Sequence, residues 1–232
     1  MTLKAVFLDA GRTLITERSS RARLYADAAR RRGLAVDDEI MASCMAEARA
    51  QLPRISNGAF RFSEAWFRDF IREIFVERLG LPVAQLPKLQ AELSARFSDP
   101  REFRLYPDSR ELLEDLARWG LFVGVLSNWS ERLEELMGGL GLGGVVDGFV
   151  VSAVVGREKP EPAIFGAALE LAGVRPDEAL HAGDEPELDY AGARAAGMRA
   201  ILVDHAGRHP DFVGERVTSL AALRATILEE VT

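Results

Sequence analysis

Short apolar runs alternate with amphipathic segments through the second half of the chain, and one further run opens it. The runs cover residues 3–8, 121–126, 149–151, 179–183 and 200–203. Runs of this length that are apolar at nearly every position are typical of strands buried in a parallel sheet. The segments between them have helical spacing. The alternation therefore predicts an α/β fold with a doubly wound, Rossmann-like parallel sheet that helices cover on both faces.

The stretch from residue 20 to residue 98 differs, because its apolar positions recur at helical spacing only. Asp37 and Ser63 are suited to cap the second and third of four helices. The predicted helices cover residues 20–32, 37–52, 63–79 and 83–97. We therefore expect an all-helical domain, residues 16–101, inserted into an α/β core domain formed by residues 1–15 and 102–232.

Two predicted helix starts in the α/β part depend on local signals. Asp108 and Glu111 have the spacing of a capping box ahead of a helix that runs to Trp119. Ser130 is expected to cap the next helix. A last amphipathic helix is expected over residues 220–228.

Composition and charge narrow the classes of function. The 232 residues carry 29 lysines and arginines against 36 acidic residues, a net charge of −7. This balance argues against a surface that binds nucleic acid or anionic lipid. The single cysteine, Cys44, excludes an internal disulfide framework, and the first apolar run is too short for a membrane span. We expect a cytoplasmic protein with no nucleic-acid or membrane partner.

Polar residues follow the predicted strands, at the edge where parallel sheets bind ligands. They are Asp9, Ser127, Asn128, Lys159 and Asp184, with Asp189 five residues further on. Any one of them alone is equally well explained as a helix cap. Together, the carboxylates indicate a hard cation such as Mg²⁺, and the lysine, hydroxyl and amide indicate a phosphoryl group. A carboxylate in this setting can act as a nucleophile in phosphoryl transfer.

Four ordered motifs extend this pattern, and a fifth run follows the last of them. They are Asp9-Ala-Gly-Arg-Thr-Leu, Leu126-Ser127-Asn128, Lys159-Pro160-Glu161-Pro162-Ala163-Ile164-Phe165, and Gly183-Asp184-x4-Asp189, followed by Ala191-Gly192-Ala193-Arg194-Ala195-Ala196-Gly197-Met198. Their order and spacing resemble those of the haloacid dehalogenase-like superfamily, subfamily I. The resemblance covers essentially the whole chain, and it implies that the helical insertion is a cap over the site.

The resemblance also implies roles for the acidic residues. Asp9 corresponds to the nucleophile that becomes an aspartyl-phosphate. The family's Mg²⁺ would be held by Asp9, the backbone carbonyl of Gly11 and Asp184. Asp189 would support the metal through water or orient Lys159.

The phosphoryl-binding residues follow from the same resemblance. Ser127 would bind the transferring phosphoryl group, with Asn128 beside it. Lys159 would supply the positive charge that a pentacoordinate phosphorus needs.

The first motif departs from the family's phosphatases, which carry a second aspartate where this chain has Gly11. That aspartate protonates the leaving group and then activates water, and losing such a group costs on the order of 10²–10⁴ in rate. The next residue, Arg12, would either bind the substrate anion or lie along the cap interface. The interface is favoured, because Mg²⁺ would repel a guanidinium.

Three functions remain open on this basis. The favoured one is Mg²⁺-dependent hydrolysis of a small phosphate monoester through an aspartyl-phosphate on Asp9, slowed by Gly11. The alternatives are a degenerate phosphate-binding or regulatory module and a metal-independent 2-haloacid dehalogenase, since dehalogenases also lack the second aspartate. Asp184 argues against a dehalogenase, which resembles serine at that position. We expect a monomer or homodimer that acts on a small phosphorylated molecule.

Two further side chains are given structural interpretations. His181, within an apolar run, is interpreted as a hydrogen-bonded histidine of the core or of the surroundings of the site. Trp129 is expected to pack between the core and the cap.

Overall fold

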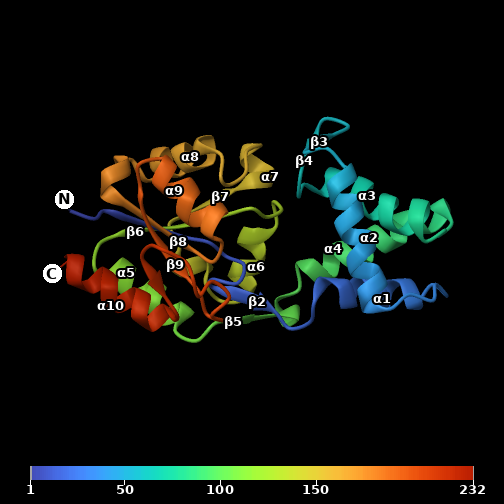
Figure 1. The fold of residues 1–232 in the computed structure, drawn as a ribbon, viewed down its shortest axis with the longest axis horizontal. Helices are drawn as coiled ribbons and strands as arrows, with labels where there is room; N and C mark the ends of the chain where they lie inside the picture. Colours follow the sequence, from blue (N-terminus) through green and yellow to red (C-terminus); the bar gives the residue numbers. More distant parts are fainter. Residues whose placement is uncertain (1, 232) are drawn as a thin grey trace.

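The computed structural model describes residues 2–231, which form an α/β lobe and a helical lobe (Figure 1). Within these residues the α/β lobe holds a six-stranded parallel sheet in the order β10-β9-β8-β1-β6-β7. Its strands are β1 (Ala5–Leu8), β6 (Phe122–Ser127), β7 (Gly148–Val151), β8 (Ala179–Gly183), β9 (Arg199–Val203) and β10 (Arg216–Val217). The five predicted strands are confirmed. The edge strand β10 was not predicted, because it is too short to show an apolar run.

The alternation of side chains along β1 explains why both faces of the sheet are covered. Val6 and Leu8 pack into one apolar cluster, whereas Ala5 and Phe7 pack into another that includes Phe165. The helices over the first face are α5 (Ser109–Arg118), α6 (Leu133–Gly139) and α10 (Leu220–Val231), and those over the second are α8 (Pro162–Ala172), the π-helical turn η6 (Pro186–Ala191) and α9 (Gly192–Ala195). The doubly wound arrangement is confirmed.

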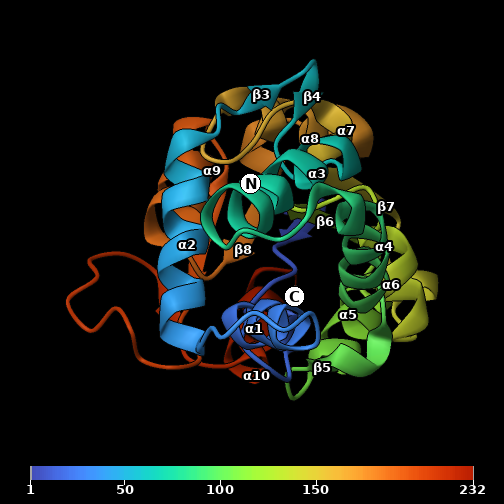
Figure 2. The ribbon, with the colours of Figure 1, turned by 90° about the vertical axis from the view of Figure 1, so that its right-hand side faces the viewer.

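The helical lobe is formed by the inserted stretch, called the cap below, and it has an apolar core of its own. Its buried residues include Met41, Ile71, Phe75 and Leu89, all fully buried. Its helices are α1 (Arg21–Arg30), α2 (Asp38–Gln51), α3 (Glu64–Arg72) with its π-helical extension η1 (Glu73–Arg78), the short turn η2 (Val83–Gln85) and α4 (Leu86–Phe97). The four predicted helices are confirmed. Figure 2 shows them in front of the α/β lobe.

Two short antiparallel ribbons accompany the cap. β2 (Ile15–Glu17) pairs with β5 (Phe103–Leu105), so the chain leaves the core and returns to it side by side. β3 (Ile55–Ser56) and β4 (Ala59–Phe60) form a hairpin around Asn57 and Gly58, both with positive φ. Asn-Gly is the preferred pair for a two-residue hairpin turn. This hairpin adds strands to a cap that was expected to contain helices alone.

The two predicted helix starts in the α/β part are wrong in detail. Asp108 has φ of 65°, in the left-handed region and not the extended one of a capping residue, and within the described chain its side chain makes no capping hydrogen bond. The hydroxyl of Ser109 instead donates to Leu14 O over 2.8 Å. The helix after Ser130 begins at Leu133, two residues later than expected, and its capping position is Arg132. Short helices complete the connections, namely η3 (Pro100–Glu102), η4 (Gly143–Val145), α7 (Ser152–Val155) and η5 (Pro176–Glu178).

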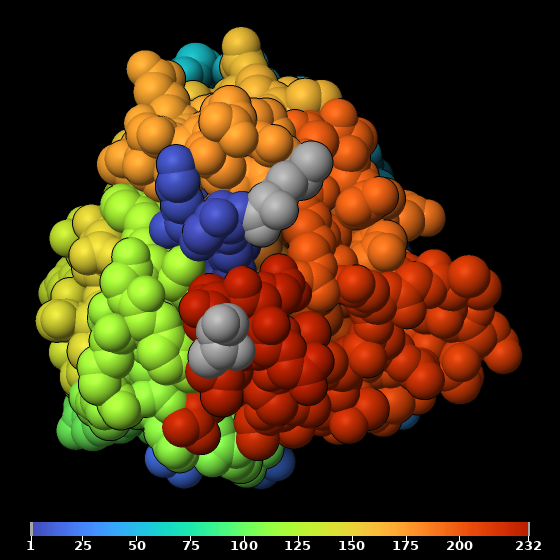
Figure 3. All heavy atoms as spheres, turned by 90° about the vertical axis from the view of Figure 1, so that its left-hand side faces the viewer, coloured from blue at the N-terminus to red at the C-terminus, as the bar shows by residue number. Residues whose placement is uncertain are grey.

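The carboxyl ends of the interior strands face the cap, which sets where a site can form. In Figure 1 the N-terminal segment enters at the end of the α/β lobe far from the cap and β1 runs toward the cap. Figure 3 views that far end, where the N-terminal segment lies beside α10. Among residues 2–231, no helix is both long and apolar enough to span a membrane.

Candidate active site

Asp9 lies directly after β1, between the two neighbouring strands. Only 6% of the residue is exposed, and its backbone N–H donates to Ala182 O of β8 over 2.9 Å. On the other side β6 ends at Ser127, whose hydroxyl donates to Asp9 Oδ1 over 2.9 Å. The register of β1 with its two parallel neighbours thus brings this carboxylate and this hydroxyl together, as the sequence analysis expected for strand ends.

Lys159 is a buried cation at the same point. Its ammonium donates to Asp9 Oδ1 over 2.7 Å, to Asp189 Oδ1 over 2.5 Å and to Leu126 O over 3.1 Å. Burial disfavours its charged form, but Asp189 and Asp9 outweigh that effect and hold the pKa of Lys159 above its usual value. Burial raises the pKa of Asp9, and Lys159 opposes this rise. The ammonium is thus held beside Asp9 as a lasting positive charge.

Asn128 holds the backbone of that lysine. The N–H of Lys159 donates to Asn128 Oδ1 over 2.8 Å, and Asn128 Nδ2 donates back to Lys159 O over 3.1 Å. This reciprocal pair fixes the lysine loop against the end of β6. Asn128 also lines the pocket at Asp9, and its contact with a substrate stays a prediction.

Three carboxylates gather at the strand ends and make a possible cation site. Oxygens of Asp9, Asp184 and Asp189 all lie within 4.8 Å of one another, and all three residues are buried. Burial and the charge of Asp9 raise the pKa of Asp184 to about 7. Neighbouring buried carboxylates repel unless a cation neutralises them, and oxygen ligands suit Mg²⁺. The donor set therefore fits a magnesium ion.

Asp189 is already engaged by three donors. Its Oδ1 contacts Lys159 and lies 2.9 Å from His181 Nε2, and its Oδ2 accepts the N–H of Glu185 over 3.0 Å. Although burial raises the pKa of Asp189, Lys159 and His181 together hold it below its usual value. His181 is fully buried, so its interpretation as a hydrogen-bonded histidine beside the site is confirmed.

Two arginines hold Asp184 from opposite ends of the chain. Arg12 Nε lies 3.0 Å from Asp184 Oδ2, and its Nη2 binds Glu185. Arg12 also lines the pocket between core and cap, so its position along the cap interface and its alternative role as a substrate ligand both stay predictions. Arg208 Nη2 donates to the same Asp184 oxygen over 2.7 Å. Arg208 was missed; the available signal was Asp204, an acid directly after β9 that binds the N–H of Arg208.

Trp129 occupies the space next to Gly11. A Cβ atom on Gly11 would lie 3.0 Å from Cζ3 of the indole. The ring also packs at 6.1 Å from the ring of Phe103 and lies 5.2 Å from the guanidinium carbon of Arg21 of the cap. Its expected packing between core and cap is confirmed. The indole of Trp129 therefore leaves little space for an aspartate side chain at position 11.

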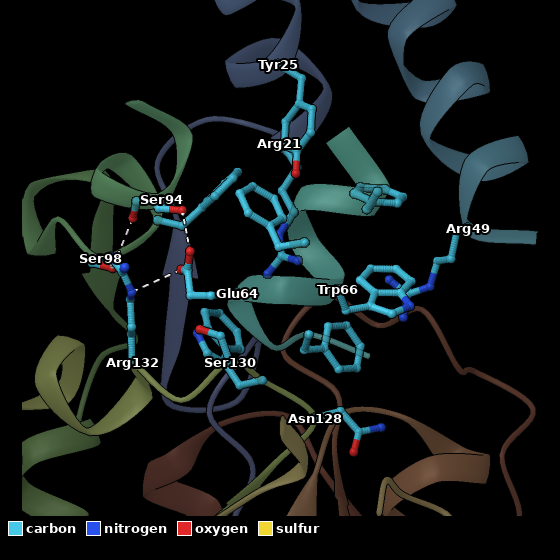
Figure 4. Close-up of a pocket in the computed structure, with 15 residues that line it drawn as sticks. Arg21, Tyr25, Arg49, Glu64, Trp66, Ser94, Ser98, Asn128, Ser130 and Arg132 are labelled. Atoms are coloured by element: carbon cyan, nitrogen blue, oxygen red, sulfur yellow. Dashed lines mark hydrogen bonds and ion pairs between the residues drawn. The ribbon is translucent and has the colours of Figure 1, made fainter. Parts of the chain in front are cut away.

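The site opens into a pocket of about 340 Å³ between the core and the cap. The cap contributes Arg21, Arg49 and Phe62 to its wall. None of these three residues was predicted to face the site, and Phe62 was interpreted as part of an apolar core stripe. Helical spacing separates buried from exposed positions but does not say which positions face the other lobe. A smaller pocket with aromatic walls adjoins it, lined by cap residues and by core residues such as Ser130 and Arg132 (Figure 4).

The order in which the chain delivers these side chains to one sheet edge is shared with a known class of enzymes. A sequence model described as a haloacid dehalogenase-like hydrolase matches residues 3–197. The chain therefore belongs to the haloacid dehalogenase-like hydrolases, and the resemblance of its motifs to that family is confirmed.

Individual relatives include two different chemistries. Haloacid dehalogenase-like hydrolase domain-containing protein 3 of Mus musculus is 34% identical over 215 residues, 90% of this chain and 84% of the relative. Phosphoserine phosphatase of Thermus thermophilus is 34% identical over 179 residues, 76% of this chain and 72% of the relative. The structure of 2-haloacid dehalogenase from Pseudomonas syringae is 26% identical with a TM-score of 0.73, over 98% of this chain and 99% of that one.

Proposed function

We propose that the protein is a phosphatase that hydrolyses a small phosphate monoester with Asp9 as the nucleophile. The observation that carries this proposal is the surroundings of Asp9, a buried carboxylate that accepts hydrogen bonds from Ser127 and Lys159. A carboxylate fixed beside an ammonium can attack phosphorus while the ammonium balances the developing charge. Relatives named as phosphatases, such as the phosphoserine phosphatase, support the same reaction class.

The reaction has two steps. In the first, a carboxylate oxygen of Asp9 bonds to phosphorus while the P–O bond to the leaving group breaks, which forms an aspartyl-phosphate and an alkoxide that takes its proton from solvent water. In the second, water attacks that phosphorus, the bond to Asp9 breaks, and inorganic phosphate leaves. Ser127 and Lys159 contact the phosphoryl oxygens in both steps. Asp189 and His181 position the ammonium of Lys159.

Mg²⁺ is the cofactor that the oxygen donors fit best. Asp9, the carbonyl of Gly11 and Asp184 would hold it, and when bound it would neutralise negative charge on the phosphoryl group. Asp184 supports this assignment, because it is a buried carboxylate next to a second one. Asp189 would orient Lys159 and reach the metal only through water.

Gly11 determines which step limits turnover. It offers no carboxylate at the position where family phosphatases protonate the leaving group and activate water. A leaving group that needs no proton, such as nitrophenolate, departs without a general acid. Hydrolysis of the aspartyl-phosphate still lacks the group that would activate water. We therefore propose that the second step is slow, by up to about 10²–10⁴.

We also propose that residues 16–101 act as a cap domain on a core of residues 1–15 and 102–232. The cap supplies one wall of the pocket, so it limits access to small molecules. Closure of such an element over a site excludes water and selects the substrate.

Rapid mixing with p-nitrophenyl phosphate tests the proposal. With Mg²⁺ we expect a burst of nitrophenolate close to one per enzyme molecule, followed by slow turnover. EDTA abolishes both phases if the metal assignment is right. Asp9→Asn is expected to lower the burst rate by at least roughly 10³, because no nucleophile remains. Asp211→Asn, an exposed acid in the loop after β9, serves as a matched control and keeps both phases.

Three results would contradict the proposal, the first its nucleophile and the other two its reaction. Hydrolysis that survives in Asp9→Asn would move the nucleophile elsewhere. No burst and no turnover, together with metal-free conversion of 2-chloropropionate, would establish a dehalogenase, the alternative that Gly11 favours. Absence of both activities, with inorganic phosphate still bound, would identify a binding module.

A further inference from the structure

The pocket beside Asp9 adjoins the smaller one between the cap and the core, and the two share part of their walls. The second pocket has a volume of about 100 Å³ and is lined in part by Tyr25, Phe67 and Phe97. The residues that line both pockets are Arg21, Arg49, Phe62, Asn128 and Trp129. A phosphate ester whose phosphoryl group lies at Asp9 would therefore direct its leaving group to this shared wall.

Arg49 brings to that wall a positive charge that forms no direct ion pair within the described residues. In the stretch from residue 2 to residue 231 its guanidinium makes no hydrogen bond or ion pair with a carboxylate, and its carbon lies 5.0 Å from the ring centroid of Phe62. Desolvation by the surrounding protein and repulsion by Arg61 and Arg21 hold the pKa of Arg49 below its usual value, although the charge of Glu158 acts in the opposite direction. Figure 4 shows the side chain extending from α2 toward the pocket.

The neighbouring cap arginines differ from Arg49 because each has an acidic partner. Arg21 Nε lies 2.8 Å from Glu17, and Arg54 and Arg61 lie 3.0 and 3.4 Å from Glu158 Oε1. A charge that is partly desolvated and crowded by like charges is unfavourable until an anion neutralises it. The aromatic ring of Phe62 gives the guanidinium a flat support but supplies no negative charge.

We propose that Arg49, with Arg21 beside it, binds a second anionic group of the substrate. The substrate class is then a small phosphate monoester whose leaving group carries a carboxylate or a second phosphate. This inference rests on the proposed function for the placement of the phosphoryl group at Asp9. Phe62 and Trp129 would contact the part of the leaving group that joins the two anions.

Calorimetric binding of inert phosphonates tests the anion site apart from catalysis. With Mg²⁺ present, 4-phosphonobenzoate is compared with 4-phosphonobenzamide, which has the same shape without the second charge, and 1,4-phenylenebisphosphonate tests a second phosphate. We expect the wild-type protein to bind at least one of the two ligands with a second acidic group roughly 10- to 100-fold more tightly than the amide, as for a charge-assisted hydrogen bond. The ligand that binds more tightly identifies the second anionic group as a carboxylate or a phosphate.

Arg49→Gln is expected to reduce that preference to within about threefold while the Kd of the amide stays nearly constant. Arg68→Gln removes an exposed arginine from α3 of the same cap and should keep the wild-type preference. Equal binding of all three phosphonates by the wild type would overturn the proposal. So would an equal loss for every phosphonate in Arg49→Gln, because a structural role would weaken all of them alike.

Hydrolysis of 4-carboxyphenyl phosphate, followed separately, distinguishes this inference from the proposed function. A binding preference without Asp9-dependent hydrolysis would contradict the proposed phosphatase activity and support the anion site at Arg49. Asp9-dependent hydrolysis without the binding preference would support the phosphatase activity and contradict the anion site at Arg49.

Discussion

At the scale of single residues, a position could be predicted when a strand fixes it. Asp9, Ser127 and Asp184 each follow an apolar run, and parallel pairing brings the ends of such runs together. Trp129 and Arg208 approach the site from loops, whose paths depend on contacts made after folding. The packing of Trp129 between core and cap was predicted, but its closeness to Gly11 and the approach of Arg208 to Asp184 were not.

The contact between Gly11 and Trp129 changes what a restored aspartate is expected to do. Gly11→Asp alone should raise steady-state turnover less than about threefold, because its Cβ already meets the indole at 3.0 Å. Gly11→Asp combined with Trp129→Ala makes room for the carboxylate and should raise turnover at least about tenfold. The measurement is steady-state hydrolysis of p-nitrophenyl phosphate, with Trp129→Ala alone as the control. A tenfold gain in the single variant would show that the indole moves aside freely.

Arg12 is expected to compete with a cation for Asp184, since its Nε lies 3.0 Å from that carboxylate. Arg12 also has φ of 60°, a conformation that glycine adopts without strain. Arg12→Gly should therefore fold normally and bind Mg²⁺ about three- to tenfold more tightly by calorimetry, because one positive charge has left the site. Arg12→Lys keeps the charge and is the matched control. Weaker binding in Arg12→Gly would mean that Arg12 helps to assemble the ligands.

At the scale of elements, the hairpin β3–β4 ties the cap to the core. Arg54, just before β3, forms ion pairs with Glu158 and Glu161 of the lysine loop. On the far side of the pocket, Glu64 of α3 contacts Arg132 of the core over 3.1 Å. The hairpin was missed because two-residue strands show no alternation, although Asn57-Gly58 was a usable turn signal.

Arg54→Gln should loosen the hairpin without unfolding the protein. Arg54 is 45% exposed, and ion pairs of this kind contribute at most about 1 kcal/mol, so the melting temperature should change little. Faster hydrogen exchange is expected in residues 55–62. Arg72→Gln breaks a pair with Glu77 within the cap and leaves that exchange unchanged. Unaltered exchange in Arg54→Gln would mean that the hairpin is held by packing alone.

At the scale of the whole molecule, the chain builds separate apolar cores. The cap cluster, which contains Leu89, is distinct from the clusters on the two faces of the sheet, one of which contains Leu113. This division was readable from the sequence, because residues 20–98 show helical spacing only. How the cap tilts over the core was not readable, since it depends on side chains that meet across the cleft.

Separate cores should respond separately to a cavity. Leu89→Ala, in the fully buried cap core, is expected to cost the cap about 2–5 kcal/mol and to speed exchange in α1–α4 while β1 and β8 stay protected. Leu113→Ala should have the opposite pattern, with faster hydrogen exchange in the α/β core while α1–α4 stay protected. Peptide-resolved hydrogen exchange separates these patterns. Equal loosening everywhere in both variants would mean one cooperative unit.

The pairing of β2 with β5 has a consequence for how such a protein can change. Ile15 lies opposite Leu105, so the entire cap begins and ends at one point of an antiparallel ribbon. From the standpoint of the sheet, the cap is the loop of a single long hairpin. Its replacement by another insertion at that ribbon alters neither strand order nor the residues that carry the chemistry. The same α/β core can therefore carry a different cap, and with it a different substrate specificity, through one insertion at this ribbon.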